Sequence, residues 1–323
     1  MKLHPLRFQP VFCYRIWGGD KLRTVLKKEY HEESIGESWE ISSVQGYETL
    51  VCEGDQEGKS LNQLIEQYKS DLVGKKVYDA FGNEFPLLIK YLDAARPLSI
   101  QVHPSDELAC DRHGSFGKNE MWYVMETDPG AELIIGFNRE IDKKEYQKLL
   151  ENDRLMEVMN AQEVKAGDTF YIPTGRVHAI GAGVLLAEIQ QTSDVTYRIF
   201  DYNRVDQKTG KKRELHNDLA LYAIDFETFD HYHTDYDRKE NQSNELVYSP
   251  YFRTNFIPLA GELKMDHAKL DSFVIYMCVS GNSSLEYQGR SYSLQLGETL
   301  LVPAQCTEVV LRGDRAELLQ VYV

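Results

Sequence analysis

Apolar and polar residues alternate with a two-residue period along much of the chain. Residues 37–42 are one example, and this period indicates β-strands because successive side chains of a strand point to opposite faces. Residues 87–102 continue the pattern around a turn at 94–97. Beyond residue 244 almost every segment has it, and Gly-Asn, Gln-Gly and Gly-Asp pairs mark the turns. The predicted C-terminal strands cover residues 273–279, 283–287, 291–294, 299–302, 308–311 and 318–323.

Three segments have a helical period instead. In the first, Leu61, Leu64, Ile65 and Tyr68 fall on one face of a helix, and Ser60 stands where an N-cap is expected. The predicted helical insertions cover about residues 58–82, 143–159 and 218–226. The chain is therefore predicted to be mainly β with helical insertions.

A turn motif occurs once in each half of the chain. The motif is a glycine and a proline separated by five residues. It occurs at Gly167 and Pro173 and again at Gly297 and Pro303, each time as a turn before an apolar strand. The first copy leads to a histidine at position 178, whereas the second has no histidine at the matching position. Two related β-domains, one with a functional metal site and one with a structural role only, explain this repeat.

The boundary between the two halves is predicted near residue 235. Residues 230–244 are polar with little apolar periodicity, which is typical of a linker or exposed loop. We therefore predict a catalytic metal-binding domain over residues 1–235 and a second domain without a metal site over residues 236–323.

Composition narrows the possible partners and the compartment. The net charge of −15 argues against nucleic acid or an anionic membrane as the main partner, because both require a basic surface. No apolar run is long enough to cross a bilayer, and residues 1–5 contain no apolar signal core. The five cysteines are scattered and form no Cys-x-x-Cys pair, which favours reduced thiols in a cytoplasmic protein. An anionic small molecule remains an expected ligand if a pocket gathers local cations.

Four residues have the types and spacing of a catalytic metal site. Gln101 and His103 are two positions apart, so on a strand they point to the same side. Glu120 and His178 can add a carboxylate and a second imidazole from later strands. Such a mixed nitrogen and oxygen set suits zinc or another first-row divalent ion and leaves positions for substrate.

Several motifs resemble known families. The pattern Gly-x5-Pro-x-Gly-x2-His, which ends at His178, resembles the second signature of the cupin barrel. Seven further segments, in family order, resemble the type I mannose-6-phosphate isomerases in their short bacterial form: Arg15–Gly19, Gly36–Glu40, Leu98–Pro104, Gly117–Glu120, His178–Gly183, Glu188–Gln190 and Ser193–Arg198.

The resemblance implies a fold, an activity and a ligand set. The fold would be two cupin-type (jelly-roll) β-barrels, the first catalytic and the second degenerate. The activity would be a zinc-dependent aldose–ketose isomerase that interconverts mannose 6-phosphate and fructose 6-phosphate through an enediolate. Carried over by motif, the ligands of one Zn²⁺ per chain would be Gln101, His103, Glu120 and His178, with Gln101 the least secure because short members can leave the glutamine out of the direct shell.

The chemistry of aldose–ketose isomerisation requires an acid/base group near the metal. A proton must leave the carbon beside a carbonyl, and a Lewis-acid metal stabilises the enediolate that forms. Lys118 lies two residues before Glu120, so on a strand it shares the lumen side, where a dication would favour its neutral form. Glu188, in an apolar strand-like run, is the second candidate, with orientation of a metal ligand as its alternative role.

Arginines are expected at the anionic end of the substrate. The family's active-site arginine falls at Arg198, whose planar guanidinium suits phosphate or hydroxyl groups; a structural salt bridge with Asp194 or Asp201 is the alternative. Ser99 and Arg204 are candidates for completing the phosphate site, and a surface role for Arg204 is equally compatible with the sequence.

Two other function classes are compatible with parts of the pattern. An Fe(II) cupin oxygenase can also use two histidines and a carboxylate, but Lys118 and Arg198 suit a phosphosugar better. A sugar-binding or regulatory cupin without catalysis is the second alternative, and the intact ligand set of the first half argues against it.

Overall fold

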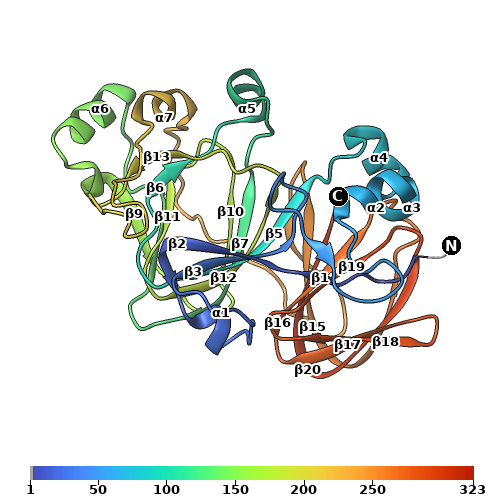
Figure 1. Ribbon diagram of the computed structural model, residues 1–323. Helices are drawn as coiled ribbons and strands as arrows, with labels where there is room; N and C mark the ends of the chain where they lie inside the picture. The colour runs from blue at the N-terminus through green and yellow to red at the C-terminus, as the bar shows by residue number, and fades with distance from the viewer. Residues whose placement is uncertain (1–2) are drawn as a thin grey trace.

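Three antiparallel β-sheets stacked face to face form the framework of the protein, as the computed structural model shows for residues 3–323 (Figure 1). The six-stranded middle sheet has the order β10-β7-β12-β5-β2-β3, with β10 (Thr169–Ile172), β7 (Glu120–Thr127), β12 (Val184–Gln191), β5 (Leu87–Ala94), β2 (Val11–Gly19) and β3 (Ile35–Ile41). The five-stranded sheet has the order β13-β6-β11-β8-β9, with β13 (Tyr197–Phe200), β6 (Ile100–Val102), β11 (His178–Ile180), β8 (Glu132–Phe137) and β9 (Met159–Glu163). The prediction of a mainly β chain is confirmed.

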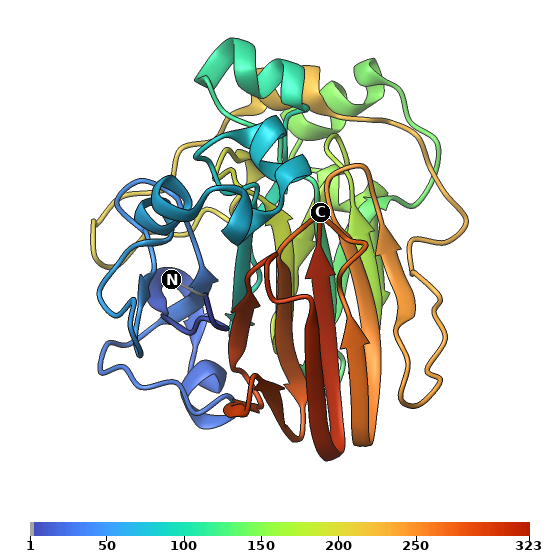
Figure 2. The same ribbon diagram turned by 90° about the vertical axis from the view of Figure 1, so that its right-hand side faces the viewer.

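The third sheet contains the C-terminal strands. Its seven strands are β14 (Asn244–Tyr248), β15 (Arg253–Asp266), β16 (Val274–Ser280), β17 (Asn282–Tyr287), β18 (Arg290–Gln295), β19 (Thr299–Val302) and β20 (Glu308–Tyr322). A small pair, β1 (Phe8–Gln9) with β4 (Leu50–Val51), lies apart from the three sheets. Figure 2 shows the long C-terminal strands side by side.

The middle sheet is buried on both faces. Every residue of β5 and of β12 is buried, and alternate positions belong to different cores. Ile89 and Tyr91 pack with Phe256 of the C-terminal sheet, whereas Leu92 packs with Ile135 of the five-stranded sheet. Burial on both faces explains why these strands read as nearly continuous apolar runs. A charged residue on such a strand is therefore buried as well.

The helices cover the edges and outer faces of this stack. They are α1 (Lys21–Thr24), α2 (Leu61–Tyr68), α3 (Ser70–Val73), α4 (Lys75–Phe81), α5 (Asp106–His113), α6 (Lys143–Glu151), the 3₁₀ turn η1 (Leu155–Val158) and α7 (Asn217–Ala223). Helices α6 and α7 pack on the outer face of the five-stranded sheet through Tyr146 and Ala220 (Figure 1). None of the helices in residues 3–323 is both long and apolar enough to cross a membrane.

The predicted helical insertions are present with changed limits. Ser60 caps α2 as predicted, through a reciprocal bond with Gln63. The second insertion consists of α6, which ends at Glu151, and the 3₁₀ turn η1, which ends at Val158, and Met159 already belongs to strand β9. Helix α5 was not predicted, although Ser105 caps it and acidic residues fill its first turn.

The C-terminal sheet corrects one predicted turn. Residues 308–311 and 318–323 were expected to be separate strands, but β20 is continuous from Glu308 to Tyr322 and pairs along β15. Gly313 lies opposite Gly261 in this ladder, next to an irregularity in the register. The Gly-Asp pair therefore marks an irregular point within a long antiparallel ladder, not a chain reversal.

The C-terminal sheet has a second apolar core on the side away from the middle sheet, which we call the interior of the C-terminal barrel. Ile257, Tyr276, Leu300 and Leu318 are among the buried residues of its core, and Cys306 is buried with them. Glu308, which occupies the position matching the first-half histidine, is exposed. Side chains thus fill the space where the first barrel has its polar site.

The predicted linker is packed against the first barrel. Tyr232 is buried in the core between the middle and five-stranded sheets, and the hydroxyl of Tyr236 donates to the carbonyl of Gly167 at 2.6 Å. The predicted exposed loop is thus partly buried. The domain boundary near residue 235 stays a prediction.

Candidate active site and metal centre

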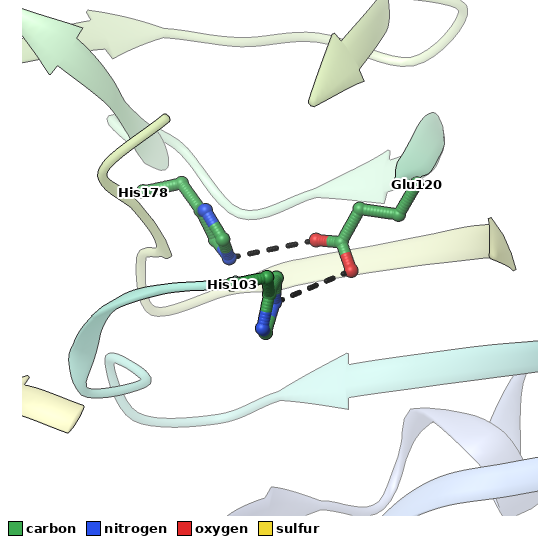
Figure 3. A group of neighbouring side chains, drawn as sticks. All are labelled: His103, Glu120 and His178. Carbon is green, nitrogen blue, oxygen red and sulfur yellow. Dashed lines mark ion pairs between the residues drawn. The ribbon is translucent and has the colours of Figure 1, made fainter. Parts of the chain in front are cut away.

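Two histidines and one glutamate meet between the middle and five-stranded sheets. His103 follows β6, Glu120 begins β7 and His178 begins β11. Nε2 of His103 lies 3.5 Å from Oε2 of Glu120, and Nε2 of His178 lies 3.5 Å from Oε1 of the same carboxylate (Figure 3). The three candidate ligand atoms lie within 4.8 Å of one another. The structure thus brings together three of the four predicted ligands.

Backbone carbonyls orient both imidazole rings. Nδ1 of His103 donates to the carbonyl of Val195 at 2.9 Å, and Nδ1 of His178 donates to the carbonyl of Arg176 at 2.8 Å. Because a carbonyl can only accept, each ring carries its proton on Nδ1 and presents the Nε2 lone pair. Burial lowers the pKa of His178 to about 4 and the pKa of His103 well below its usual value. Both rings are therefore neutral near pH 7, as metal ligands must be.

The carboxylate of Glu120 has the environment of a metal ligand. Glu120 is fully buried, and its Oε1 has no hydrogen-bond donor among the described residues. A buried carboxylate oxygen without a donor costs free energy unless a cation approaches it. Two imidazole nitrogens and a carboxylate form a donor set that suits zinc and other first-row divalent ions. The residues present therefore fit a metal ion.

Gln101 lies at the edge of this cluster. Its Nε2 is 3.3 Å from Nε2 of His178, and the two residues are opposite each other in the ladder between β6 and β11. Its side chain also lines the cavity described below. The role of Gln101 as a direct ligand stays a prediction.

Lys118 and Glu188 lie next to the cluster, as predicted. Nζ of Lys118 contacts the Glu120 carboxylate and lies 3.3 Å from Nε2 of His103 and 3.8 Å from Oε1 of Glu188. Burial acts to lower the pKa of Lys118, but the Glu120 and Glu188 carboxylates outweigh it and raise the pKa. Trp122 donates from Nε1 to Glu188 at 3.0 Å and fixes that carboxylate.

A second pair of buried charges continues this row of groups. Lys90 lies on β5 directly opposite Glu188 of β12, and its Nζ is 3.2 Å from Oε1 of Glu188 and 3.9 Å from Glu37. Glu37 in turn receives two hydrogen bonds of 2.9 Å from Arg15. Burial would raise the pKa of Glu37, but Arg15 and Lys90 lower it to about 2. Positive and negative groups thus alternate from the cavity wall to the metal-ligand cluster.

A cavity of about 430 Å³ opens beside the cluster. Its walls include Trp17, Trp39, Ser99, Arg198 and Arg213. The volume suits a small polar metabolite, and the ligand would meet charged side chains on most sides.

The two predicted arginines have different surroundings. Arg198 lines the cavity, donates from Nη1 to the carbonyl of Glu214 at 2.8 Å and has a buried Nε without a partner. Arg204 does not line the cavity among the described residues; it contacts the carboxylate of Asp201 and the carbonyl of Pro97. The Asp201 carboxylate is thus paired with Arg204 and with a further arginine of the same loop, not with Arg198.

Sequence reasoning missed several residues of the site. Lys90, Glu37, Arg15 and Arg213 were not among the candidates, although all four line the cavity. A lysine inside the apolar run of residues 87–92 was the clearest available signal, because a buried charge needs a partner. The basic segment at residues 211–213 was a weaker one.

The fold and the site together define an enzyme of the cupin class with a group of side chains able to hold a metal ion. Residues 6–137 match the model of the type I phosphomannose isomerase catalytic domain, and residues 242–323 match that of the mannose-6-phosphate isomerase cupin domain. The chain belongs to the type I mannose-6-phosphate isomerase family. The resemblance and the cupin fold inferred from the sequence are confirmed.

Relatives match over nearly the whole chain. Mannose-6-phosphate isomerase ManA of Bacillus subtilis is 34% identical over 97% of each chain. The mannose-6-phosphate isomerase of Streptococcus mutans is 32% identical over 96% of each chain. A crystal structure of the mannose 6-phosphate isomerase from Bacillus subtilis superposes with a TM-score of 0.90 at 32% identity and covers 99% of this chain and 100% of its own.

Proposed function

We propose that this protein interconverts mannose 6-phosphate and fructose 6-phosphate and that His103, Glu120 and His178 hold a zinc ion for this reaction, with Gln101 as a fourth candidate ligand. The observation that carries the proposal is the buried Glu120 carboxylate, whose Oε1 receives no hydrogen bond and whose two oxygens each lie 3.5 Å from the Nε2 of one histidine, next to a cavity lined by Arg198 and Arg213. The full-length relatives named as mannose-6-phosphate isomerases support the choice of substrate.

Zinc bound there would act as a Lewis acid that favours ionisation next to the substrate carbonyl. The protein side chains would move the proton. Lys118 and Glu188 are the two groups beside the cluster that can take a proton from one sugar carbon and return it to its neighbour. They lie 3.8 Å apart and both line the cavity, so either can act on the same substrate, and the Trp122 hydrogen bond holds Glu188 in place.

Other residues of the cavity would bind and orient the sugar phosphate. Arg198 has an unpartnered buried Nε and lies on the cavity wall, so it can donate to a phosphate or hydroxyl oxygen. Ser99 lies on the same wall and is buried. Trp17 and Trp39 exclude water from the side of the cavity that faces Lys90 and Glu37.

The remaining parts of the proposal concern domains and location. Residues 1–235 would form the catalytic domain and residues 236–323 a domain without a metal site. A phosphosugar substrate would place the protein in the cytoplasm, and its five free cysteines agree with that compartment.

The test is an isomerase assay on mannose 6-phosphate, with and without a chelator, combined with elemental analysis of protein purified without added metal. We expect about one zinc per chain and activity that is lost on chelation and restored by zinc. His178→Ala should lose both metal and activity, whereas His233→Ala, at a half-exposed histidine outside the cluster, should lose neither. Activity that survives chelation in metal-free protein would contradict the proposal, and oxygen uptake with bound iron would identify an oxygenase instead.

A further inference from the structure

Positive charge gathers at one end of the cavity of this acidic protein. Arg198, Arg204 and Arg213 surround a single carboxylate, that of Asp201. The chain as a whole carries a net charge of −15. Three guanidinium groups around one carboxylate leave an excess of positive charge at this place, which an anionic ligand would neutralise.

The three arginines differ in how many of their donors are already used. Arg204 donates from Nη2 to Asp201, from Nη1 to the carbonyl of Pro97 and from Nε to the carbonyl of Asp201 at 3.3 Å. Arg204 therefore braces the loop against the residues before β6. All three of its nitrogens already donate to the protein, and Arg204 does not line the cavity among the described residues.

Arg213 keeps one edge of its guanidinium for a ligand. Its Nε and Nη2 donate to the two oxygens of Asp201 at 2.9 and 2.6 Å, which fixes the plane of the group. The remaining nitrogen, Nη1, carries two further hydrogens. Arg213 lines the cavity, so a ligand inside the cavity can meet it.

The backbone holds Arg213 beside Arg198. Arg198 donates from Nη1 to the carbonyl of Glu214 and from its backbone N–H to Nδ1 of His216 at 3.1 Å, and the backbone N–H of His216 donates to the carbonyl of Arg198 at 2.7 Å. The segment that begins at Arg213 therefore runs along β13. The Nε–H of Arg198, which has no acceptor among the described residues, and the open edge of Arg213 belong to one wall of the cavity.

Strand register sets the distance from this wall to the metal-ligand cluster. Arg198 of β13 is opposite Gln101 of β6, and Gln101 is opposite His178 of β11. Neighbouring strands are about 4.8 Å apart, so Arg198 and His178 are separated by roughly 10 Å across the sheet. An extended six-carbon sugar phosphate with its carbonyl near His178 would bring its phosphate to the arginine wall.

We propose that Arg213, together with Arg198, binds the phosphate group of the substrate, and that Arg204 is a structural brace of the loop. This inference rests on the proposed isomerase function and assigns the specificity for a phosphorylated sugar to a residue of loop 201–213. Asp201 is the positioning residue, because it orients Arg213 with both of its oxygens.

Besides Glu37 and Glu188, two further carboxylates line the cavity, those of Asp194 and Asp206. Asp206 accepts hydrogen bonds from Tyr14 at 3.3 Å and from the backbone N–H of Lys208 at 2.8 Å, so its charge is held within the loop. Asp194 comes before β13 in the sequence, whereas loop 201–213 follows it. Asp194 also lines the cavity. Both weaken the positive field, and a bidentate contact from fixed guanidinium groups is therefore more important here than net charge alone.

The experiment compares Arg213→Gln with Arg204→Gln in the metal-loaded protein. Steady-state kinetics on mannose 6-phosphate, competitive inhibition by inorganic phosphate and the melting temperature are measured for each. Arg213→Gln should raise KM and the inhibition constant for phosphate together, on the order of tenfold to a hundredfold, with a smaller change in kcat. Arg213→Lys, which keeps the charge but not the fork, should recover part of this loss.

Arg204→Gln should instead lower the melting temperature and change KM less than Arg213→Gln does. The control is Lys211→Ala, an exposed cation of the same loop outside the cavity, which should leave KM and the inhibition constant unchanged. A larger KM effect at Arg204 than at Arg213, or unchanged phosphate inhibition in Arg213→Gln, would overturn the inference. If the wild-type protein is active in the same assay, the isomerase function still holds. Wild-type protein that does not convert mannose 6-phosphate would overturn both.

Discussion

Lys90 provides the sharpest test of how buried charges hold the site together. Its side chain is only 6% exposed, and its Nζ lies between Glu188 at 3.2 Å and Glu37 at 3.9 Å, 4.9 Å from the centre of the Trp39 ring. Lys90→Met keeps most of the aliphatic stem and removes the charge. Both carboxylates would then remain buried with less compensation.

The expected loss of stability follows from this burial. Removing one partner of a buried ion pair costs about 3–5 kcal/mol, because an uncompensated charge is left behind. Here each carboxylate keeps a second cation, Arg15 for Glu37 and Lys118 for Glu188. We therefore expect a loss of about 3 kcal/mol in the free energy of unfolding, at the lower end of that range.

Lys21→Met is the matched control. Lys21 also has two carboxylate partners, Glu126 at 3.3 Å and Asp128 at 2.8 Å, but these are 45% and 63% exposed. Exposed ion pairs contribute about 0–1 kcal/mol. The same chemical change should therefore cost at most about 1 kcal/mol at Lys21.

Urea unfolding of the metal-free protein at pH 7 measures both losses without the stabilisation that a bound metal adds. The difference between the variants should persist in 1 M salt, since buried pairs are poorly screened. Adding Glu188→Gln to Lys90→Met should restore part of the stability, because it removes one of the two buried carboxylates that have lost a cation. Equal losses at Lys90 and Lys21, or a double variant less stable than Lys90→Met alone, would refute the reasoning.

Four further outcomes are expected. His178→Ala should abolish bound metal and turnover with an unchanged circular dichroism spectrum, as elemental analysis and kinetics would show. Arg198→Lys should lower turnover of mannose 6-phosphate roughly a hundredfold at normal metal content, whereas a lower melting temperature with near-normal kinetics would make Arg198 structural. Burial would raise the pKa of Glu37, but neighbouring cations, first Arg15, lower it to about 2, so its stabilisation is present above its unfolded pKa of 4.5 and is lost as pH falls toward 2. The destabilisation by Glu37→Gln, measured in urea, should therefore be large at pH 7 and shrink below pH 4. Glu308→Ala should leave turnover unchanged, and a second metal per chain, in the C-terminal barrel, would contradict the predicted loss of chemistry there.

The candidate metal site could be predicted because its determinants are local. Gln101 and His103 alternate on one strand, and the turn before His178 has a recognisable pattern of glycine and proline. The three groups that meet in the structure, His103, Glu120 and His178, were all named from these motifs. A two-residue period is enough to predict which side chains share a face.

The partners of the charged residues could not be predicted in the same way. Lys90 meets Glu188 because β5 and β12 pair in one register, which no local pattern specifies. The different roles of Arg204 and Arg213 depend on how loop 201–213 folds around Asp201. Long-range pairing and loop conformation decide such contacts, and a single sequence contains little information on either.

Local signals also failed where tertiary structure overrode them. The Gly313-Asp314 pair is typical of a turn, but β20 continues through it because β15 pairs with the strand on both sides. Helix α5 has a good cap at Ser105 but a weak apolar stripe, since Ala109 is its only buried residue. Its amphipathic pattern was therefore too faint to detect.

The double burial of the middle sheet constrains how the C-terminal barrel can change over evolutionary time. Phe256, Ile275 and Leu319 point out of that barrel and cover the back of the strands that hold Lys90 and Glu188. Under the proposal that this barrel holds no metal site, its interior is free to vary within the limits of packing, whereas this outer face is not. Substitutions there would expose the back of the middle sheet to water and destabilise the fold. Selection for isomerase activity would then act against them because less folded protein is present, although every active-site group is intact.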